Sequence, residues 1–249
     1  MLSFWDRINN WYFPIITGIF ILALVFFFFL EKEKKEKPEF FLPFSLIILT
    51  VFYEYLAAIT VHFKEINNWI YPIFNYPHEN NYNIWVYNFF GSHLTSLLFL
   101  AIIYRYLFSL NKRKIVKWLC MLFVFAYSVF QLTGIESFFE QQAYSIFVGY
   151  SVVIIACGLF FIELISHPNY LEINPIKAYS FWQVTIILFY YSILFLIEIS
   201  FNYIISISMD LMESLYVISM IIWTLILFTF LVSIILNTRF FTPKELSYE

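Results

Sequence analysis

Seven long apolar stretches alternate with short polar segments along this chain. The stretches cover residues 11–30, 40–61, 84–108, 115–133, 142–166, 179–205 and 214–236. An α-helix needs about 20 mainly apolar residues to cross a hydrocarbon core of about 30 Å, and it satisfies its own backbone hydrogen bonds there. The pattern therefore predicts an all-α integral membrane protein, a seven-transmembrane helix bundle, with residues 1–249 as a single polytopic membrane domain.

The composition supports this prediction. Hydrophobic residues make up 62% of the chain and charged residues 12%, whereas soluble domains are about half apolar and about a quarter charged. The polar segments are too short for a sizeable soluble domain, and the net charge of −3 gives no sign of nucleic-acid binding.

The basic residues predict the orientation of the bundle. If seven helices alternate in direction, only Arg7 and Lys64 lie on the side of the N-terminus. The other side holds twelve basic residues: Lys32, Lys34, Lys35, Lys37, Arg105, Lys112, Arg113, Lys114, Lys117, Lys177, Arg239 and Lys244. Because Lys and Arg accumulate in cytoplasmic loops, we expect the N-terminus outside and the C-terminus in the cytoplasm.

Residue usage and loop composition add two expectations about the membrane. The frequent use of Ile, Phe, Tyr, Asn and Lys is typical of AT-rich coding and suggests a multi-pass protein of the cell membrane, the inner membrane of a bacterium. The longest polar connection, residues 62–83, is rich in Trp, Tyr and Pro. We expect it to lie at the membrane interface, with a short helix among the lipid headgroups.

Five of the polar side chains inside the predicted helices are grouped by depth, in a region where an ionisable group costs about 3 kcal/mol or more and needs a partner or a function. In the predicted topology all of them lie in the outer half of the membrane: Glu54, His93, Gln131, Glu198 and Asn202. We take them as candidates for binding a ligand or a proton. A second tier of candidates, of which Glu136 and Glu140 lie in the loop above the five, consists of His62, Tyr191, Ser92, Glu136 and Glu140.

Helical spacing places several of these side chains on shared faces. The predicted stripes are Thr50, Glu54 and Ala58; Asn88, Ser92 and Thr95, with His93 at their edge; and Tyr191, Glu198 and Asn202. One interpretation is an outer cavity that these faces line and that holds water or a ligand. The alternative is structural: Glu54 or Glu198 pairs with His93 or a nearby hydroxyl and stabilises the bundle.

Small residues follow one face of the fifth predicted helix. The face carries Ser145, Gly149 and Ala156, together with Gln142 and Glu163. Small residues allow close approach of helix backbones, so this face predicts a helix-packing seam. We expect Glu163, near the cytoplasmic end of the helix, to reach water or Lys177.

Several activities lack the residues that they need. Retinal binding needs a lysine within a span, and the last apolar stretch has none. The four histidines form no HxxxH or HExxH pair, and the chain has no GxSxG sequence and no phosphate loop. We therefore predict no catalytic residue, no cofactor and no bound metal, although His62, His93 and Glu54 are a conceivable ligand set.

A transporter is harder to exclude. Transport sites usually lie on helices broken by Gly or Pro, but this chain has only five glycines, and its prolines lie at helix starts or in loops. A possible three-plus-one-plus-three repeat favours transport, because Glu54 and Glu198 both lie on the second helix of a triplet.

These observations favour a receptor-like or regulatory (sensor) subunit with a polar cavity in the outer leaflet. The tail after the last apolar stretch, residues 237–249, holds no output domain, so signalling would need a cytoplasmic or membrane partner protein or a homo-oligomer in the lipid bilayer. The alternative is a small proton- or ion-coupled transporter or channel. An intramembrane enzyme and a structural assembly subunit are further alternatives.

Overall fold

The computed structural model describes residues 10–73, 84–171, 176 and 178–236, and it confirms seven helices that are long and apolar enough to cross a membrane. They are α2 (Tyr12–Phe29), α4 (Pro38–His62), a continuous helical segment formed by α6 (Ile84–Val86), η1 (Tyr87–Leu94) and α7 (Thr95–Tyr106), α8 (Leu110–Leu132), α9 (Ala143–Ser166), α11 (Tyr179–Ile207) and α12 (Met209–Ile235). The described residues contain no strand. Their orientation relative to a membrane stays a prediction.

Within the described ranges, three short helices connect the long ones. They are α3 (Lys32–Lys35), α5 (Lys64–Ile73) and α10 (Pro168–Leu171). Helix α5 lies in the connection for which we expected a short interfacial helix, and Trp69 on it is exposed. Residues 74–83 of that connection lie outside the described part of the chain.

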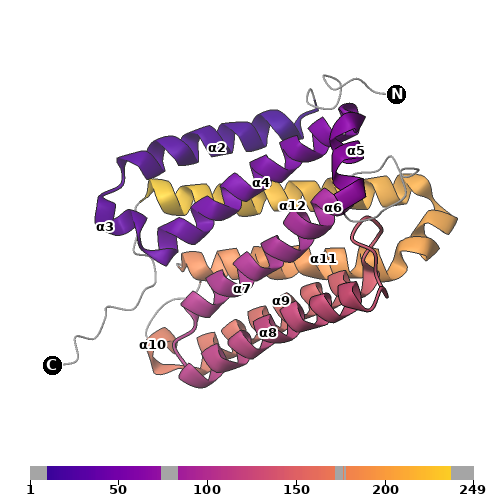
Figure 1. The fold of residues 1–249 in the computed structure, drawn as a ribbon. Helices are drawn as coiled ribbons and strands as arrows, with labels where there is room; N and C mark the ends of the chain where they lie inside the picture. The colour runs from indigo at the N-terminus through magenta and orange to yellow at the C-terminus, as the bar shows by residue number, and fades with distance from the viewer. Residues whose placement is uncertain (1–9, 74–83, 172–175, 177, 237–249) are drawn as a thin grey trace.

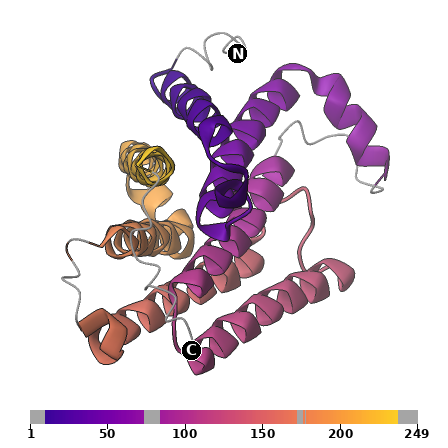
Figure 2. The same cartoon turned by 90° about the vertical axis from the view of Figure 1, so that its left-hand side faces the viewer.

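Six of the seven long helices form a closed ring. Each helix in the order α2, α4, α7, α9, α11, α12 packs against the next, and α12 packs back against α2. Viewed along the bundle, α11 and α12 lie on one side, while α2 and α4 lie at the top and α9 at the bottom (Figure 2). The ring holds the first three long helices next to one another and the last three next to one another.

Aromatic side chains fill the middle of this ring. Phe99 on α7 is fully buried, and its ring contacts the rings of Tyr191, Trp223 and Phe230 at centroid distances of 5.5, 5.8 and 6.3 Å. These side chains come from α11 and α12, so Phe99 connects α7, which lies between α4 and α9 (Figure 1), to the other side of the ring.

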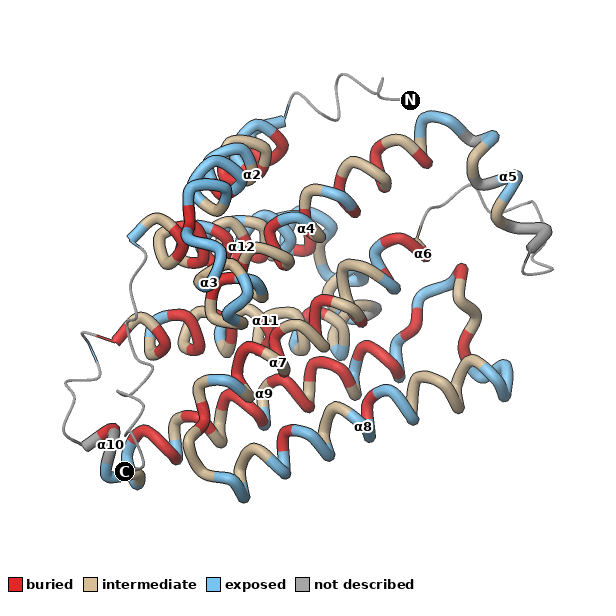
Figure 3. Tube along the Cα trace, turned by 60° about the vertical axis from the view of Figure 1, so that its left-hand side comes forward, coloured by how far each residue is buried: buried red, intermediate tan, exposed pale blue. Residues whose placement is uncertain are grey.

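Helix α8 lies outside the ring, against α9 and α7. In its most apolar window 11% of the residues are buried, against 50% in the corresponding window of α9. The burial colouring shows the same contrast between α8 and its neighbours (Figure 3). The exposed face of α8 is apolar, which fits a helix that faces lipid.

The two ends of the bundle differ in charge. At the end where α2 and α9 begin, called the acidic end, the described acidic residues are Glu54, Glu65, Glu136, Glu140, Glu198, Asp210 and Glu213. At the opposite end, called the basic end, the described basic residues are Lys32, Lys34, Lys35, Lys37, Arg105, Lys112, Arg113, Lys114 and Lys117.

Two helices begin about one turn earlier than the apolar pattern predicts. Helix α8 begins at Leu110 instead of residue 115, and α12 begins at Met209 instead of residue 214. Hydropathy ends a predicted span at the first charges, but Lys and Arg are good helix formers and continue α8 through its basic residues. The Ser208 hydroxyl accepts the Leu211 N–H at 3.2 Å and caps α12, which places Asp210 in the first turn.

Candidate functional site

A π-helix interrupts the third predicted span at the acidic end. Residues Tyr87–Leu94 form η1, between the short α6 and the regular α7. Hydrogen bonds from residue i to i+5 widen such a segment and change which side chains share a face, and π-helical segments are frequent at functional sites. Asn88 and His93, five residues apart, are both buried, whereas Ser92 is half-buried. The wider spacing of the π-helix therefore places His93, which α-helical spacing predicts at the edge of the polar stripe, among the buried side chains with Asn88 and Thr95.

The Glu54 pocket lies beside η1 at the acidic end. It has a volume of about 290 Å³ and is partly open to the surroundings. Its lining residues come from the start of α2, from α4, from η1 and from α12: Asn10, Tyr12, Phe13, Glu54, Ala57, Ala58, Tyr87 and Met220. This volume is at the lower limit of small-molecule sites in proteins, so the pocket suits a small ligand.

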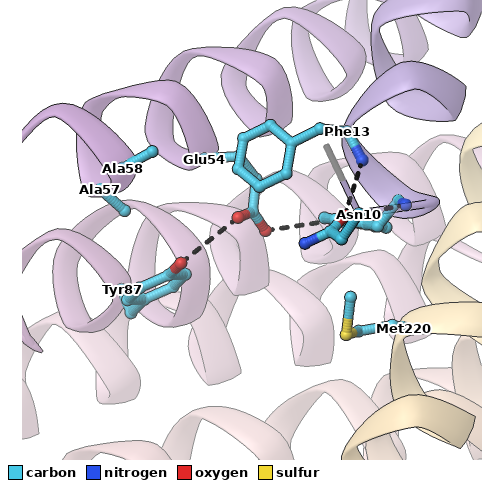
Figure 4. A pocket seen from close by; sticks show the side chains of 8 residues that line it. Asn10, Phe13, Glu54, Ala57, Ala58, Tyr87 and Met220 are labelled. Carbon is cyan, nitrogen blue, oxygen red and sulfur yellow. Dashed lines mark hydrogen bonds between the residues drawn. The ribbon is translucent and has the colours of Figure 1, made fainter. Parts of the chain in front are cut away.

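Two tyrosines position the Glu54 carboxylate. The Tyr12 hydroxyl donates to Oε1 at 3.1 Å, and the Tyr87 hydroxyl donates to Oε2 at 3.3 Å. Figure 4 shows the carboxylate between Tyr87 on η1 and the first turn of α2. Each oxygen therefore has one donor, and these donors come from different helices.

Asn10 closes the side of the pocket next to α2. Its side-chain Oδ1 accepts the backbone N–H groups of Tyr12 at 2.9 Å and Phe13 at 3.2 Å. These donors have no partner inside the helix at its N-terminus, so Asn10 acts as a cap. The cap fixes the first turn of α2 and with it the position of the Tyr12 hydroxyl.

A second polar network joins η1 to the connection between α8 and α9, residues 133–142. The Asn88 side-chain amide donates to the Glu140 carbonyl oxygen at 2.6 Å. His93 Nε2 and Gln142 Oε1 are 2.5 Å apart, and the Gln142 amide donates to the Ser137 carbonyl oxygen at 3.2 Å. The π-helix therefore holds this connection through two buried side chains.

His93 is enclosed by aromatic rings on its other side. Its ring lies 4.4 Å from that of Tyr127 and 5.7 Å from that of Phe123, both on α8. Among the described residues Nδ1 of His93 has no hydrogen-bond partner. His93 thus links η1, α8 and the start of α9.

Glu136 and Glu198 take part in separate contacts at the same end. The Glu136 carboxylate accepts the backbone N–H groups of Tyr144 at 2.5 Å and Ser145 at 3.1 Å, and also the Ser145 hydroxyl. It therefore stabilises the N-terminus of α9. The Glu198 carboxylate accepts the Gln141 side-chain amide at 2.9 Å.

The structure distributes the predicted site residues over several local networks. Glu54 lines the pocket and His93 contacts Gln142, and among the described residues neither Glu54 nor Glu198 forms a hydrogen bond to His93. The remaining candidates are not part of the pocket lining. Gln131 lies near the end of α8 with Nε2 unpartnered among the described residues, and Asn202 lies on α11 with its side chain outside the described set.

The supporting candidates also have separate positions. Tyr191 is buried in the ring and hydrogen-bonds Ser96 at 3.2 Å, and Ser92 lies within reach of the Tyr150 hydroxyl. His62 is exposed at the end of α4, and its ring contacts that of Phe63. Glu140 contributes its backbone carbonyl to the network described above.

The packing seam of α9 lies inside the bundle. Ser145, Gly149 and Ala156 are all buried. A Cβ atom on Gly149 would meet the Phe123 ring of α8 at 3.0 Å and the Ser96 hydroxyl of α7 at 3.6 Å. This face of α9 therefore approaches α8 and α7 closely.

Glu163 does not reach water as expected. The side chain is fully buried, and Oε1 accepts the backbone N–H groups of Phe108 and, at 2.8 Å, of Ser109. Lys112 Nζ lies 3.7 Å from Oε2. Lys177, the partner that we expected, lies outside the described residues. The free N–H groups between α7 and α8 attract the carboxylate inward, because they have no partner in either helix.

Sequence reasoning missed the residues that complete the pocket. Tyr12 and Tyr87 are near helix starts, where tyrosines are also typical of the membrane interface, so their position carried no specific signal. Asn10 and Met220 lie far from Glu54 in the sequence and reach it only through the packing of α2 and α12 around α4. A possible signal was the Asn10 position just before an apolar helix, which is typical of a cap.

No protein-family model, curated protein or solved structure matches this chain. Its function must therefore be inferred from its own residues.

Proposed function

We propose that this chain is a receptor-like regulatory subunit in a membrane, with the Glu54 pocket as its ligand site and the N-terminus on the outer side. The observation that carries the proposal is the position of Tyr87. It lines the pocket and bonds Glu54, and it is also the first residue of η1. The next residue, Asn88, bonds the connection between α8 and α9.

This arrangement gives a physical route from the pocket to the surface. A ligand that bonds Glu54 competes with the Tyr87 hydroxyl and changes the position of the first turn of η1. Asn88 and His93 then shift relative to residues 133–142, which they hold. Ligand binding changes such an equilibrium only if the ligand contacts the two states differently, and a ligand at Glu54 meets this condition through Tyr87.

A labelling experiment tests the coupling without any ligand. Ile135 is exposed in the connection, so Ile135→Cys in a background with Cys120→Ala and Cys157→Ala provides a single reactive thiol. We expect Tyr87→Phe to change the labelling rate of this thiol several-fold in detergent. Tyr12→Phe is the matched control, because it removes a hydroxyl from the same carboxylate but lies on α2.

The two variants distinguish coupling from a general loss of stability. The proposal requires that Tyr12→Phe leaves the labelling rate close to that of the parent protein. Equal effects of the two variants, or no effect of either, contradict a route through η1.

A carrier is the second candidate, and the arrangement of the ring supports it. The triplets α2, α4, α7 and α9, α11, α12 each begin at the acidic end and follow the same order in the ring, with α8 outside. Glu54 lies eight residues before the end of α4, and Glu198 lies nine residues before the end of α11. Repeated helix groups of equal direction occur in transporters, and so do irregular helices such as η1 at membrane depth.

Flux measurements separate a carrier from a receptor. The purified protein is placed in vesicles under a pH gradient, and proton flux is followed with an interior dye. A flux that Glu54→Gln or Glu198→Gln abolishes assigns the carrier function and contradicts the receptor proposal. Vesicles with no flux above protein-free controls support the receptor.

A further inference from the structure

Among the described residues, the Glu54 carboxylate has hydrogen-bond donors but no cation beside it. The ion pairs between described residues join Glu31 to Lys34, Glu39 to Arg105, and Glu163 to Lys112, so none involves Glu54. The lining residues of the pocket include no Lys, Arg or His. An acid within a span that has no charged partner is expected to have a functional role.

The rest of the pocket is apolar or aromatic. Phe13, Ala57, Ala58 and Met220 offer carbon and sulfur surfaces, and the rings of Tyr12 and Tyr87 add aromatic ones. Asn10 already uses Oδ1 for two backbone N–H groups. Beyond the carboxylate and the two hydroxyls, the lining therefore supplies few groups that accept a hydrogen bond.

We propose that the Glu54 pocket binds a small methylated ammonium group of the choline type, an inference that rests on the proposed function. A trimethylammonium group brings a positive charge without N–H donors, and aromatic rings and a carboxylate are the surroundings that such cations prefer. A primary ammonium has three donors that need acceptors. A hard metal ion needs about six oxygen ligands, more than this pocket offers.

The depth of the site allows two sources for this group. Glu54 lies eight residues from the end of α4, which corresponds to about 12 Å along the helix axis. A trimethylammonium group could come from a free solute or from the headgroup of a choline lipid in the surrounding leaflet. The chemistry at Glu54 is the same in both cases.

Choline and its neutral isostere provide the test. In the isostere a carbon atom replaces the quaternary nitrogen, so shape is kept and charge is lost. Binding to the full chain is measured by isothermal titration calorimetry in a maltoside detergent that contains no choline. We expect choline to bind at least about ten-fold more tightly than the isostere, because the charge contacts a carboxylate away from bulk water.

Variants at two acids assign the site. Glu54→Gln keeps the shape of the side chain and is expected to weaken choline binding about ten-fold or more. Glu198→Gln is the matched control, because it removes an acid at the same end of the bundle that does not line the pocket. Equal binding of choline and its isostere, or an equal loss in both variants, overturns the proposal.

A third variant tests the pocket without a change in charge. Ala58→Leu places additional carbon atoms in the pocket, and we expect it to abolish choline binding while the protein elutes as the parent does from a sizing column. Retained binding in a folded Ala58→Leu protein contradicts the site. If Glu54→Gln does not fold, this variant still decides the question.

Lipid bilayers of defined composition identify the source of the ligand. The chain is placed in nanodiscs of phosphatidylglycerol or of phosphatidylcholine, and choline is titrated into each. Weaker apparent binding in phosphatidylcholine shows that a lipid headgroup competes for the pocket, and equal binding shows a site for a free solute. Both results support the ammonium site.

The inference and the proposed function can fail separately. Choline binding with no response of the Ile135→Cys label to Tyr87→Phe retains the ammonium site but contradicts the receptor function. A label that responds to Tyr87→Phe in a protein that does not distinguish choline from its isostere retains the receptor function and overturns the ammonium site.

Discussion

Glu54 and Glu163 are both buried carboxylates inside helical spans, but they have different kinds of partners. Glu163 accepts two backbone N–H groups and lies 3.7 Å from the Lys112 ammonium. Among the described residues, Glu54 accepts only two tyrosine hydroxyls, and it lines a pocket of about 290 Å³. The first acid is at the basic end of the bundle and the second is at the acidic end.

The two acids differ in whether their hydrogen-bond donors can find other partners. The backbone donors at Phe108 and Ser109 have no alternative partner in α7 or α8, so loss of Glu163 leaves buried N–H groups unpaired. Tyrosine hydroxyls can rotate about the C–O bond, and both tyrosines line the partly open pocket. Glu163 is therefore a structural group that fixes the connection between α7 and α8, while Glu54 can exchange its partners.

Removal of Glu163 is expected to cause the largest loss of stability. Glu163→Ala leaves two buried N–H groups unpaired and removes the acid beside the Lys112 ammonium, which costs about 3 kcal/mol or more. For a chain of this size we expect the midpoint of thermal unfolding in detergent to fall by roughly 6–12 °C. The measurement is a thermal scan of near-ultraviolet circular dichroism.

Glu163→Gln is the control for this prediction. Its amide oxygen can still accept the N–H groups of Phe108 and Ser109, so we expect a smaller fall than with Glu163→Ala. A midpoint unchanged in both variants removes the distinction between the two acids, because Glu163 would then be as dispensable for folding as we expect Glu54 to be.

The apolar pattern predicted the seven helices because each contains a run of about 20 mainly apolar residues. Such a run is visible in the sequence without any knowledge of the helix's neighbours. It did not predict η1. A π-helix depends on contacts that the local sequence does not contain, such as the bonds of Asn88 and His93 to residues 133–142. Alpha-helical spacing predicts His93 at the edge of the polar stripe, whereas the structure buries it together with Asn88.

The candidate site was predicted in part. Glu54 could be selected because an acid in a span is costly wherever it lies. Its partners could not, since Tyr12 and Tyr87 are 42 and 33 residues away and reach it through helix packing. Depth alone also groups Glu54 with His93 and Glu198. Residues at one depth can face different neighbours around a ring of helices, so a shared depth does not bring their side chains together.

Two glycine substitutions on α9 test how closely side chains pack around His93 at the acidic end. Gly149→Ala places a Cβ atom 3.0 Å from the Phe123 ring, which itself contacts His93. Gly158→Ala on the same helix meets no atom within 4 Å. Alanine favours a helix by about 1 kcal/mol over glycine, while an overpacked contact costs about 1–3 kcal/mol.

We therefore expect the two alanine variants to differ. Gly158→Ala should raise the midpoint of thermal unfolding by a few degrees, because 1 kcal/mol corresponds to roughly 2–4 °C in a chain of this size. Gly149→Ala should stay below Gly158→Ala by about 1–3 kcal/mol in stability, because both variants gain the same helix propensity and the first also has an overpacked contact. If both variants raise the midpoint equally, Phe123 moves freely, and the contacts around His93 are looser than the structure indicates.

Substitution of Glu54 should give the smallest change in stability of the three. Glu54→Gln keeps an oxygen that can accept one tyrosine hydroxyl, and the other hydroxyl can turn to accept from the amide. We expect the midpoint of thermal unfolding to change by less than about 2 °C, which corresponds to less than about 1 kcal/mol. A fall as large as that of Glu163→Ala would show that Glu54 holds α2, α4 and η1 together, and the acid would then need no ligand to explain its place in the membrane. A small change leaves its burial without a structural reason, and a function in the pocket is then the remaining explanation.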